Sequence, residues 1–416
     1  MKVKSLISIS FLMAQGLMAH PVPLKRNLSL EKEVVKTYAK IAYANYRDSL
    51  AGAEILEKNL AAFTAAAESG ASQADLDALF ETSKLAWTYQ ARLPYGQSEI
   101  FRFYNGPVDF EPINDGVDTY LETIGFEGVE GLMNAWPLDE AYIDYVQGDA
   151  NAGIINDRSI EISREQIELL NERDGEKNIS AGFHAIEFLL WGQDFNTDGP
   201  GMRPVKDFTV EKNADRRRLY LNTLGSTLVS HLKKVTDQWT PQSENFREEL
   251  EGLDTHKVLE SLFVSMTSMA GDELKSERIE NALLLEDQEE EHSCFSDTTV
   301  NDIYTNYLGV KNIYLGQYTA FNFAEKVSGA SVSDLVAELN PALDKRIREA
   351  FLEVEKTIAP FYGVNAQNLG LGRNQIALNF DVAITSEQDS VQAMIDTLDV
   401  LDGALRDAAQ ELGIRL

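Results

Sequence analysis

The chain has 416 residues, of which 44% are hydrophobic and 9% aromatic, so it can build a substantial core in one large domain or two ordinary ones. Its formal net charge of −30 at pH 7 argues against partners such as nucleic acid or anionic membrane surfaces. The single cysteine, Cys294, excludes an internal disulfide, so the fold must rest on packing, alone or with a bound metal.

The first residues have the pattern of a secretory signal peptide. Lys2 and Lys4 precede an apolar run that ends in small residues near Ala19. This run is too short for a membrane anchor, and no later uncharged apolar stretch reaches the roughly 18 residues of a membrane span. We therefore predict a signal peptide over residues 1–19 and a mature chain without a transmembrane segment.

Most of the remaining sequence places apolar residues at three- and four-residue spacing, which is typical of amphipathic helices. Ser72 precedes an acidic first turn, as at a helix start, and Pro94 should end or kink the helix that follows. The predicted helices of the first half cover residues 33–68, 72–93, 96–103, 158–173 and 180–192, and those of the second half cover 213–239, 254–284, 331–358 and 390–412. Strand-like alternation is scarce, so the predicted fold class is all-α.

The two halves of the sequence share a plan. Each opens with a long helix, continues with a helix beginning Leu-Asp (Leu76, Leu253), and ends in an amphipathic helix. We predict two tandem, duplicated helical bundles at 28–200 and 206–416, joined near a Pro/Gly-rich stretch. Three irregular stretches interrupt the helices, at 104–116, 193–208 and 286–302.

The segment NISAGFHAIEFLLWGQD carries two polar side chains, His184 and Glu187, on an otherwise apolar predicted helix. Three residues place both side chains on one helix face, where they could reach one metal ion. An imidazole with a carboxylate suits iron, zinc or manganese better than calcium. Gly182 would let another backbone approach closely. The alternative is a structural, hydrogen-bonded pair.

Two local ligands are too few for a metal site, so other segments must contribute. Glu99 is the first candidate, beside Arg92 and Arg102 next to the expected helix break, although it could instead form a plain ion pair with Arg102. His292 and Asp297 are further candidates. The acidic run 286–291 before them is predicted to be solvated.

Several other chemistries find no support. Phe188 follows Glu187, so neither H-E-x-x-H nor H-x-x-E-H is present, and a zinc peptidase built on one helix is not supported. No Gly-rich phosphate loop, nucleophile elbow or Ser-His-Asp set is recognisable. The stretch DFNTDG, Asp194–Gly199, opens like an EF-hand calcium loop, but its twelfth position is Val205 instead of Glu, so we predict an Asx-rich turn. The lone histidines His231 and His256 are expected to be structural or at the surface.

Together, GFHAIEFLLWGQD and GPGMRPVKDF resemble the imelysin family, whose mark is G-x-H-x-x-E. WTYQARLPYGQSEIFRFYNGPVD, NAWPLDEAYIDYV and EHSCFSDTTVNDI extend the resemblance to the branch called iron-regulated protein A, over essentially the whole mature chain. It implies two helical bundles with a site between them, a periplasmic or cell-surface location and a role in iron acquisition. His184 and Glu187 match the motif, and Glu99 matches a carboxylate in the family's Y-x-x-S-E-x-x-R-F stretch. The family is also classed with metallopeptidases.

Three hypotheses follow. In the first, the protein binds a metal, iron before zinc, or an iron chelate, through His184, Glu187 and Glu99, and meets an outer-membrane or periplasmic iron-transport partner. His292 or Asp297 would add ligands or support from the second bundle, and Arg92 and Arg102 would hold carboxylates in place. In the second, the protein is a metallopeptidase of the imelysin type with Glu187 as general base. In the third, it is a non-catalytic peptide- or ligand-binding module whose pair only ties the bundles together.

Overall fold

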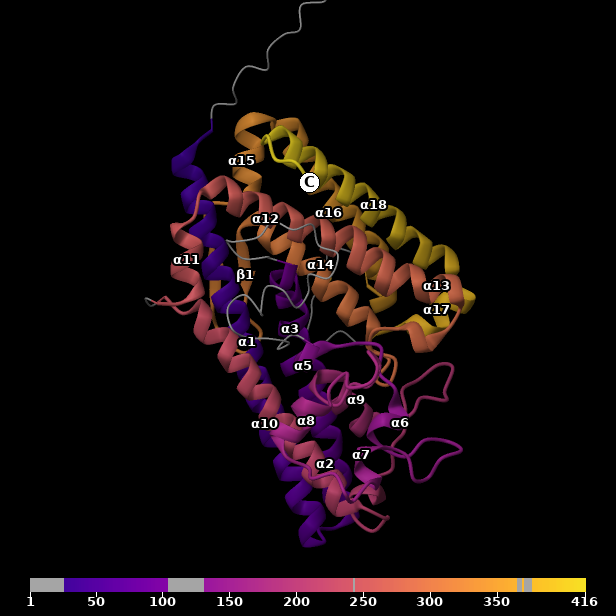
Figure 1. Cartoon of the computed structure of the whole chain (residues 1–416). Coiled ribbons are helices and arrows are strands. Elements are labelled where there is room, and N and C mark those ends of the chain that lie inside the picture. The colour runs from indigo at the N-terminus through magenta and orange to yellow at the C-terminus, as the bar shows by residue number, and fades with distance from the viewer. Residues whose placement is uncertain (1–25, 104–130, 242–243, 365–368, 370–375) are drawn as a thin grey trace, which may run out of the picture.

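The computed structural model describes residues 26–103, 131–241, 244–364, 369 and 376–416 (Figure 1). The predicted signal peptide and the predicted irregular stretch 104–116 lie outside these residues. The first half contains α1 (Leu28–Ser69), α2 (Gln73–Leu85), η1 (Ala86–Arg92), α3 (Leu93–Ser98), η2 (Glu99–Phe103), α5 (Gly131–Asn134), α6 (Glu140–Ile143), α7 (Gly153–Asn156), α8 (Arg164–Leu170), α9 (Gly182–Trp191) and η3 (Val205–Phe208).

The second half adds further helices and a small hairpin. They are α10 (Ala214–Trp239), α11 (Phe246–Gly252), α12 (Thr255–Thr267), η4 (Ser268–Glu280), α13 (Asn281–Leu285), η5 (Gln288–Glu290), α14 (Thr299–Leu315), β1 (Gln317–Thr319), β2 (Lys326–Ser328), α15 (Val332–Leu339), α16 (Pro341–Ile358), η6 (Ala359–Tyr362), α17 (Phe380–Ser386) and α18 (Gln388–Glu411). The prediction of an all-α protein is confirmed. No described helix is long and apolar enough to cross a membrane.

The helix α1 is the longest described element, with 42 residues, or roughly 63 Å at the α-helical rise. Asn27 caps its start by accepting a hydrogen bond from the backbone N–H of Leu30, and Gly70 ends it in a left-handed conformation. Figure 1 shows α1 side by side with α10, and it also contacts α2, η1, α3 and α12. One contiguous core therefore draws on both halves of the sequence. The division into bundles at 28–200 and 206–416 stays a prediction.

Pro94 does not end the helical segment that begins at α2. The helix widens to a π-helix over η1, and α3 follows without a break in the helical backbone, with Pro94 in its first turn. Helical turns continue to η2. The widened turns of a π-helix are frequent at functional sites, and here they carry Arg92 next to Glu99.

Two predicted helices need correction, and one long helix was not predicted. The helix predicted at 158–173 is wrong in extent, because Ser163 caps α8 by accepting from the backbone N–H of Gln166 and the helix ends at Leu170. The helix predicted at 331–358 is two helices, because Asn340 ends α15 and caps α16. The prediction missed α14, part of which it placed in an irregular stretch. Nearly every residue of α14 is buried, polar ones included, so no apolar stripe marks it in the sequence.

Candidate functional site

The helix α9 is buried along its whole length and is fixed at both ends. Gly182 begins it with φ 88°, and a Cβ there would lie 2.4 Å from the carbonyl oxygen of Met133, so only glycine allows this approach. The indole nitrogen of Trp87 donates to the carbonyl of Phe183 at 3.0 Å. Gly192 ends the helix with φ 77°. The close backbone approach predicted for Gly182 is confirmed.

His184 and Glu187 contact each other on this helix. The distance from His184 Nδ1 to Glu187 Oε2 is 2.8 Å, and both side chains are 0% exposed. The other carboxylate oxygen, Oε1, accepts hydrogen bonds from the backbone N–H and the hydroxyl of Ser296, at 3.0 and 2.6 Å. Within the described residues, His184 Nε2 has no hydrogen-bond partner. Glu187 thus holds the imidazole of His184 by Nδ1 and leaves Nε2 available to a ligand.

Burial controls the charge of the pair. It raises the pKa of Glu187 to about 8, with Asp302 adding to the rise and the hydrogen bonds from Ser296 opposing it. Burial also lowers the pKa of His184 well below its usual value, and the nearby charges of Arg92 and Arg278 lower it further. Both groups are therefore neutral at pH 7 in the metal-free protein.

Aromatic rings pack around the imidazole of His184. The ring of His292 lies 4.9 Å from that of His184 in an edge-on arrangement, and Trp136 lies 4.8 Å from His184 and 6.3 Å from His292. The ring of Phe295 lies 5.8 Å from Trp136. The structure therefore brings His292 to the pair, although its position is more than a hundred residues later in the chain.

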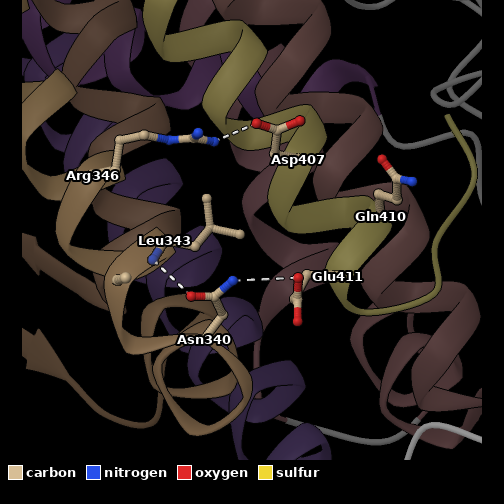
Figure 2. A pocket seen from close by; sticks show the side chains of 7 residues that line it. Asn340, Leu343, Arg346, Asp407, Gln410 and Glu411 are labelled. Carbon is tan, nitrogen blue, oxygen red and sulfur yellow. Dashed lines mark hydrogen bonds and ion pairs between the residues drawn. The ribbon is translucent and has the colours of Figure 1, made fainter. Parts of the chain in front are cut away.

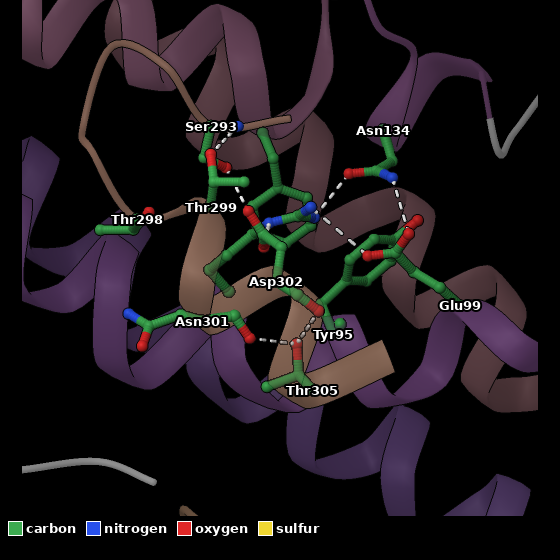
Figure 3. A network of polar contacts seen from close by, with 12 residues as sticks. Tyr95, Glu99, Asn134, Ser293, Thr298, Thr299, Asn301, Asp302 and Thr305 are labelled. Atoms are coloured by element: carbon green, nitrogen blue, oxygen red, sulfur yellow. Dashed lines mark hydrogen bonds and ion pairs between the residues drawn. The ribbon is translucent and has the colours of Figure 1, made fainter. Parts of the chain in front are cut away.

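Glu99 belongs to a buried network of polar side chains (Figure 3). Its Oε2 accepts from Arg278 at 2.7 Å and from Asn134 at 3.1 Å, and its Oε1 lies 3.4 Å from the guanidinium of Arg92. Arg92 also donates to Asp302 at 2.8 Å. Arg92 thus holds carboxylates, as its position in the sequence suggested. The side chain of Arg102 lies outside what the structure describes, and so does the predicted Glu99–Arg102 pair.

The prediction missed two charged members of this network, Arg278 and Asp302. Arg278 lies on η4, inside the predicted helix 254–284, and Asp302 lies in the first turn of α14. Ser293 donates to Asp302 and so ties the loop before α14 to the network. Their signal in the sequence was weak, because Arg278 reaches Glu99 across 179 positions of the chain.

Asp297 has a different partner from its neighbour Ser296, which binds Glu187. It accepts a hydrogen bond from Asn379 at 2.9 Å and has a left-handed backbone, with φ 54°. Glu291 is 1% exposed, so the prediction of a solvated acidic run is wrong for its last member. His231 is buried and contacts Glu168 at 2.8 Å, as expected of a structural residue, and Cys294 is a buried free thiol.

The residue types at this site suit a metal ion, but too few of their side chains are positioned to share one. His184 Nε2 is a buried nitrogen without a protein partner in the described region, and imidazole is a common ligand of iron and zinc. A carboxylate on the other ring nitrogen, as Glu187 supplies, is the usual support of a metal-bound histidine. No three His, Cys, Asp or Glu side chains of the described residues are placed to share one ion. The arrangement thus offers one oriented ligand.

A separate surface pocket of about 690 Å³ lies between α16 and α18 (Figure 2). Arg346 pairs with Asp407 across it, and Asn340 caps α16 while contacting Glu411. It contains none of the residues predicted for the metal site.

Comparison with known proteins places this chain in a family. The model of the imelysin family, Peptidase_M75, matches residues 42–404. The chain belongs to the imelysin family. This imelysin is 23% identical over 379 residues to iron-regulated protein A of Synechococcus elongatus, covering 89% of this chain and 83% of that protein.

Two solved structures share the fold of this imelysin. One, described as an iron-regulated protein A precursor from Parabacteroides distasonis, has a TM-score of 0.63 at 16% identity and covers 94% of this chain and 96% of its own. The other, an imelysin-like protein from Psychrobacter arcticum, has a TM-score of 0.58 at 14% identity and covers 95% of this chain and 99% of its own. The resemblance to this family predicted from the sequence is confirmed.

Proposed function

We propose that this imelysin binds iron at the cell envelope and serves iron uptake, with His184, Glu187 and Glu99 at the metal site. The observation that carries the proposal is the orientation of His184. Its Nδ1 is held by Glu187, while its Nε2 is buried and has no hydrogen-bond partner in the described structure. A buried polar atom left without a partner is costly, and a metal ion would compensate that cost.

The remaining ligands must come from groups that lie close to His184. Glu187 contributes directly if its Oε1 gives up the hydrogen bonds from Ser296. The imidazole of His292 is adjacent. Glu99 would approach from the network in which Arg92 and Arg278 now hold it. A chelate that brings its own ligands needs fewer of these movements, so an iron chelate is included in the proposal.

The link to iron and the location have separate support. The relative from Synechococcus elongatus is named iron-regulated protein A. The basic start and apolar run of residues 1–19 are the pattern of an export signal, which fits a periplasmic or cell-surface protein. Such a protein would deliver its iron to an outer-membrane or periplasmic transport partner.

The test is metal binding by the mature chain, purified without an affinity tag. Fe(II), Fe(III) and Zn(II) are titrated by calorimetry into the wild type, into His184→Gln and into the matched control His231→Gln. His231 is also a buried histidine 2.8 Å from a glutamate, so the control removes an equivalent pair elsewhere. We expect one tight site that is at least about 100-fold weaker in His184→Gln, as for loss of a direct ligand, and unchanged in the control. A wild type without a site, or a site that survives in His184→Gln, contradicts the proposal.

The family's peptidase label suggests a different use of Glu187, as a general base. In the metal-free arrangement both oxygens of Glu187 are hydrogen-bonded, one to His184 and the other to Ser296, so Glu187 could accept a proton from a water only after one of these contacts is broken. Peptide cleavage that requires metal and is abolished in Glu187→Gln, with metal still bound, would favour the peptidase over the binding protein.

A further inference from the structure

Trp136 is the ring that connects the buried His184 to the protein surface. Two described rings pack against the imidazole of His184, that of Trp136 at 4.8 Å and that of His292 at 4.9 Å. His184 is 0% exposed and His292 is 5% exposed, whereas Trp136 is partly exposed. Of the two rings, the indole of Trp136 is therefore the one that extends from the site to solvent.

The other three tryptophans of the chain belong to the core. Trp87 and Trp239 are 0% exposed, and Trp191 is 5% exposed. Trp87 is also fixed by a hydrogen bond from its indole nitrogen to the carbonyl of Phe183, at 3.0 Å. The stabilisation from burial is proportional to the apolar area removed from water. Trp136, which stays partly in water, can therefore be displaced at a lower cost than these three.

The backbone is anchored on both sides of Trp136. Before it, the side chain of Asn134 donates to Glu99 at 3.1 Å (Figure 3). After it, the backbone N–H of Asp139 donates to the carbonyl of Lys177 at 2.7 Å. Residues 135–138, between these anchors, lie outside helices and strands. A movement of Trp136 therefore involves a short segment and leaves the helices on either side in place.

The two other described rings at this site are more deeply buried. Phe295, whose ring lies 5.8 Å from that of Trp136, is 1% exposed. His292 directly precedes Ser293, whose hydroxyl donates to the buried Asp302 and so ties this loop to the network in the core. Displacing Trp136 is thus the easier way to open the site.

We propose that Trp136 is the lid of the His184 site, moving outward to admit a ligand to Nε2 and closing over it afterwards. Nε2 has no hydrogen-bond partner in the described structure. Opening breaks ring contacts that are individually weak, so it requires no unfolding of the core. Closure excludes water from the bound ligand and slows its exchange. The identity of that ligand, iron or its chelate, rests on the proposed function, whereas the movement of the lid can be tested without metal.

The first test measures access to His184 in the metal-free mature chain. Diethyl pyrocarbonate acylates neutral imidazole nitrogens near neutral pH, and mass spectrometry of proteolytic peptides gives the rate at each histidine. Trp136→Ala should accelerate labelling of His184 by about tenfold or more, because the ring contacts that it removes oppose opening by a free energy of that order. Trp136→Phe keeps a smaller ring, so its rate should lie between those of Trp136→Ala and the wild type.

Two histidines serve as internal controls. His256, partly exposed at the start of α12, should be labelled at the same rate in every variant. His231, 0% exposed on α10, should stay protected as long as the chain is folded. Phe323→Ala is the matched control variant, because it removes an exposed ring elsewhere, between β1 and β2, and it should leave the labelling of His184 unchanged.

The labelling rates decide between three outcomes. An unchanged rate at His184 in Trp136→Ala, with His231 still protected, would overturn the lid. If His231 becomes reactive as well, Trp136→Ala has lost its fold, and Trp136→Phe decides in its place. Faster labelling of His184 alone in Trp136→Phe supports the lid, and a wild-type rate there contradicts it.

The second test uses metal-loaded protein and rests on the proposed function. Release of Fe(II) or Zn(II) to a chelator, followed by stopped-flow absorbance, should be about tenfold or more faster in Trp136→Ala than in the wild type. Phe323→Ala should release the metal at the wild-type rate. Equal rates in Trp136→Ala and the wild type would speak against the lid. A wild type without a metal site contradicts the proposed function alone, and the labelling of His184 then still decides on the lid.

Discussion

Two histidine–glutamate pairs in this imelysin have the same contact distance and different surroundings. His184 Nδ1 lies 2.8 Å from Glu187, and His231 Nε2 lies 2.8 Å from Glu168. Glu168 is 27% exposed and also accepts a hydrogen bond from Arg164, whereas Glu187 is 0% exposed and is bound by the uncharged Ser296. Neither the spacing nor the contact therefore marks a functional pair.

The difference lies in how each carboxylate is compensated. The pKa of Glu168 is lowered, because hydrogen bonds from Arg164 and His231 outweigh the opposing effect of burial. The pKa of Glu187 is raised to about 8, because burial dominates. The carboxylate of Glu168 is compensated by Arg164, although His231 Nδ1, like His184 Nε2, is buried without a hydrogen-bond partner among the described residues. A buried pair without a charged partner, surrounded by Trp136 and His292, remains open to a ligand.

The largest expected effect comes from disturbing the backbone at the start of α9, the helix that carries the buried pair. Gly182→Ala places a Cβ 2.4 Å from the Met133 carbonyl at a positive φ, so we expect a loss of about 3 kcal/mol or more in the free energy of unfolding, measured by urea denaturation. Gly70→Ala is the control, since Gly70 also has a positive φ but nothing within 4 Å. Equal losses in the two variants would show that packing around Gly182 is adjustable.

A smaller effect separates the two glutamates. Glu187→Ala removes the acceptor of the buried backbone N–H and hydroxyl of Ser296 and leaves a cavity, so we expect a loss of about 2–4 kcal/mol in the free energy of unfolding. Glu168→Ala removes a partly exposed partner and should cost about 1 kcal/mol or less. Both are measured in metal-free protein by denaturant titration. A similar cost for both would mean that burial does not distinguish the pairs.

The smallest effect is on how stability depends on pH. The two glutamate-to-glutamine variants should shift the melting temperature of the metal-free protein in opposite directions. The folded-state pKa of Glu187 is raised from 4.5 to about 8, so its ionisation destabilises the fold progressively as pH rises through that window. Glu187→Gln should therefore gain stability relative to wild type between pH 5 and pH 8. Because the pKa of Glu168 is lowered in the folded state, ionised Glu168 stabilises the fold at pH values above its pKa in the unfolded state. Glu168→Gln should therefore be less stable than wild type at neutral pH and as stable as wild type in acid. The same sign for both would contradict this account.

The sequence was a good guide to the helices and to α9, because burial on one face leaves a regular apolar spacing. It failed at α14, where Asn301, Asp302 and Thr305 are buried and hide that spacing. It indicated His184, Glu187 and Glu99 as candidates, but neither Arg278, which binds Glu99, nor Asp302, which binds Arg92. Contacts between distant segments leave no local pattern in a single sequence. Glu291 was misjudged for the same reason, since an acidic run shows its charge and not its burial.

The complete burial of His184 and Glu187 has a kinetic consequence. With both side chains 0% exposed, a metal ion can reach or leave Nε2 only when the covering segments move apart. Exchange would then proceed at the rate of that opening, and adding more of a competing chelator would not accelerate it once opening limits the rate. If the chain binds a metal as proposed, it would retain the ion through slow release as well as through affinity. A partner that receives the ion would then act by opening the site, not by binding the ion more tightly.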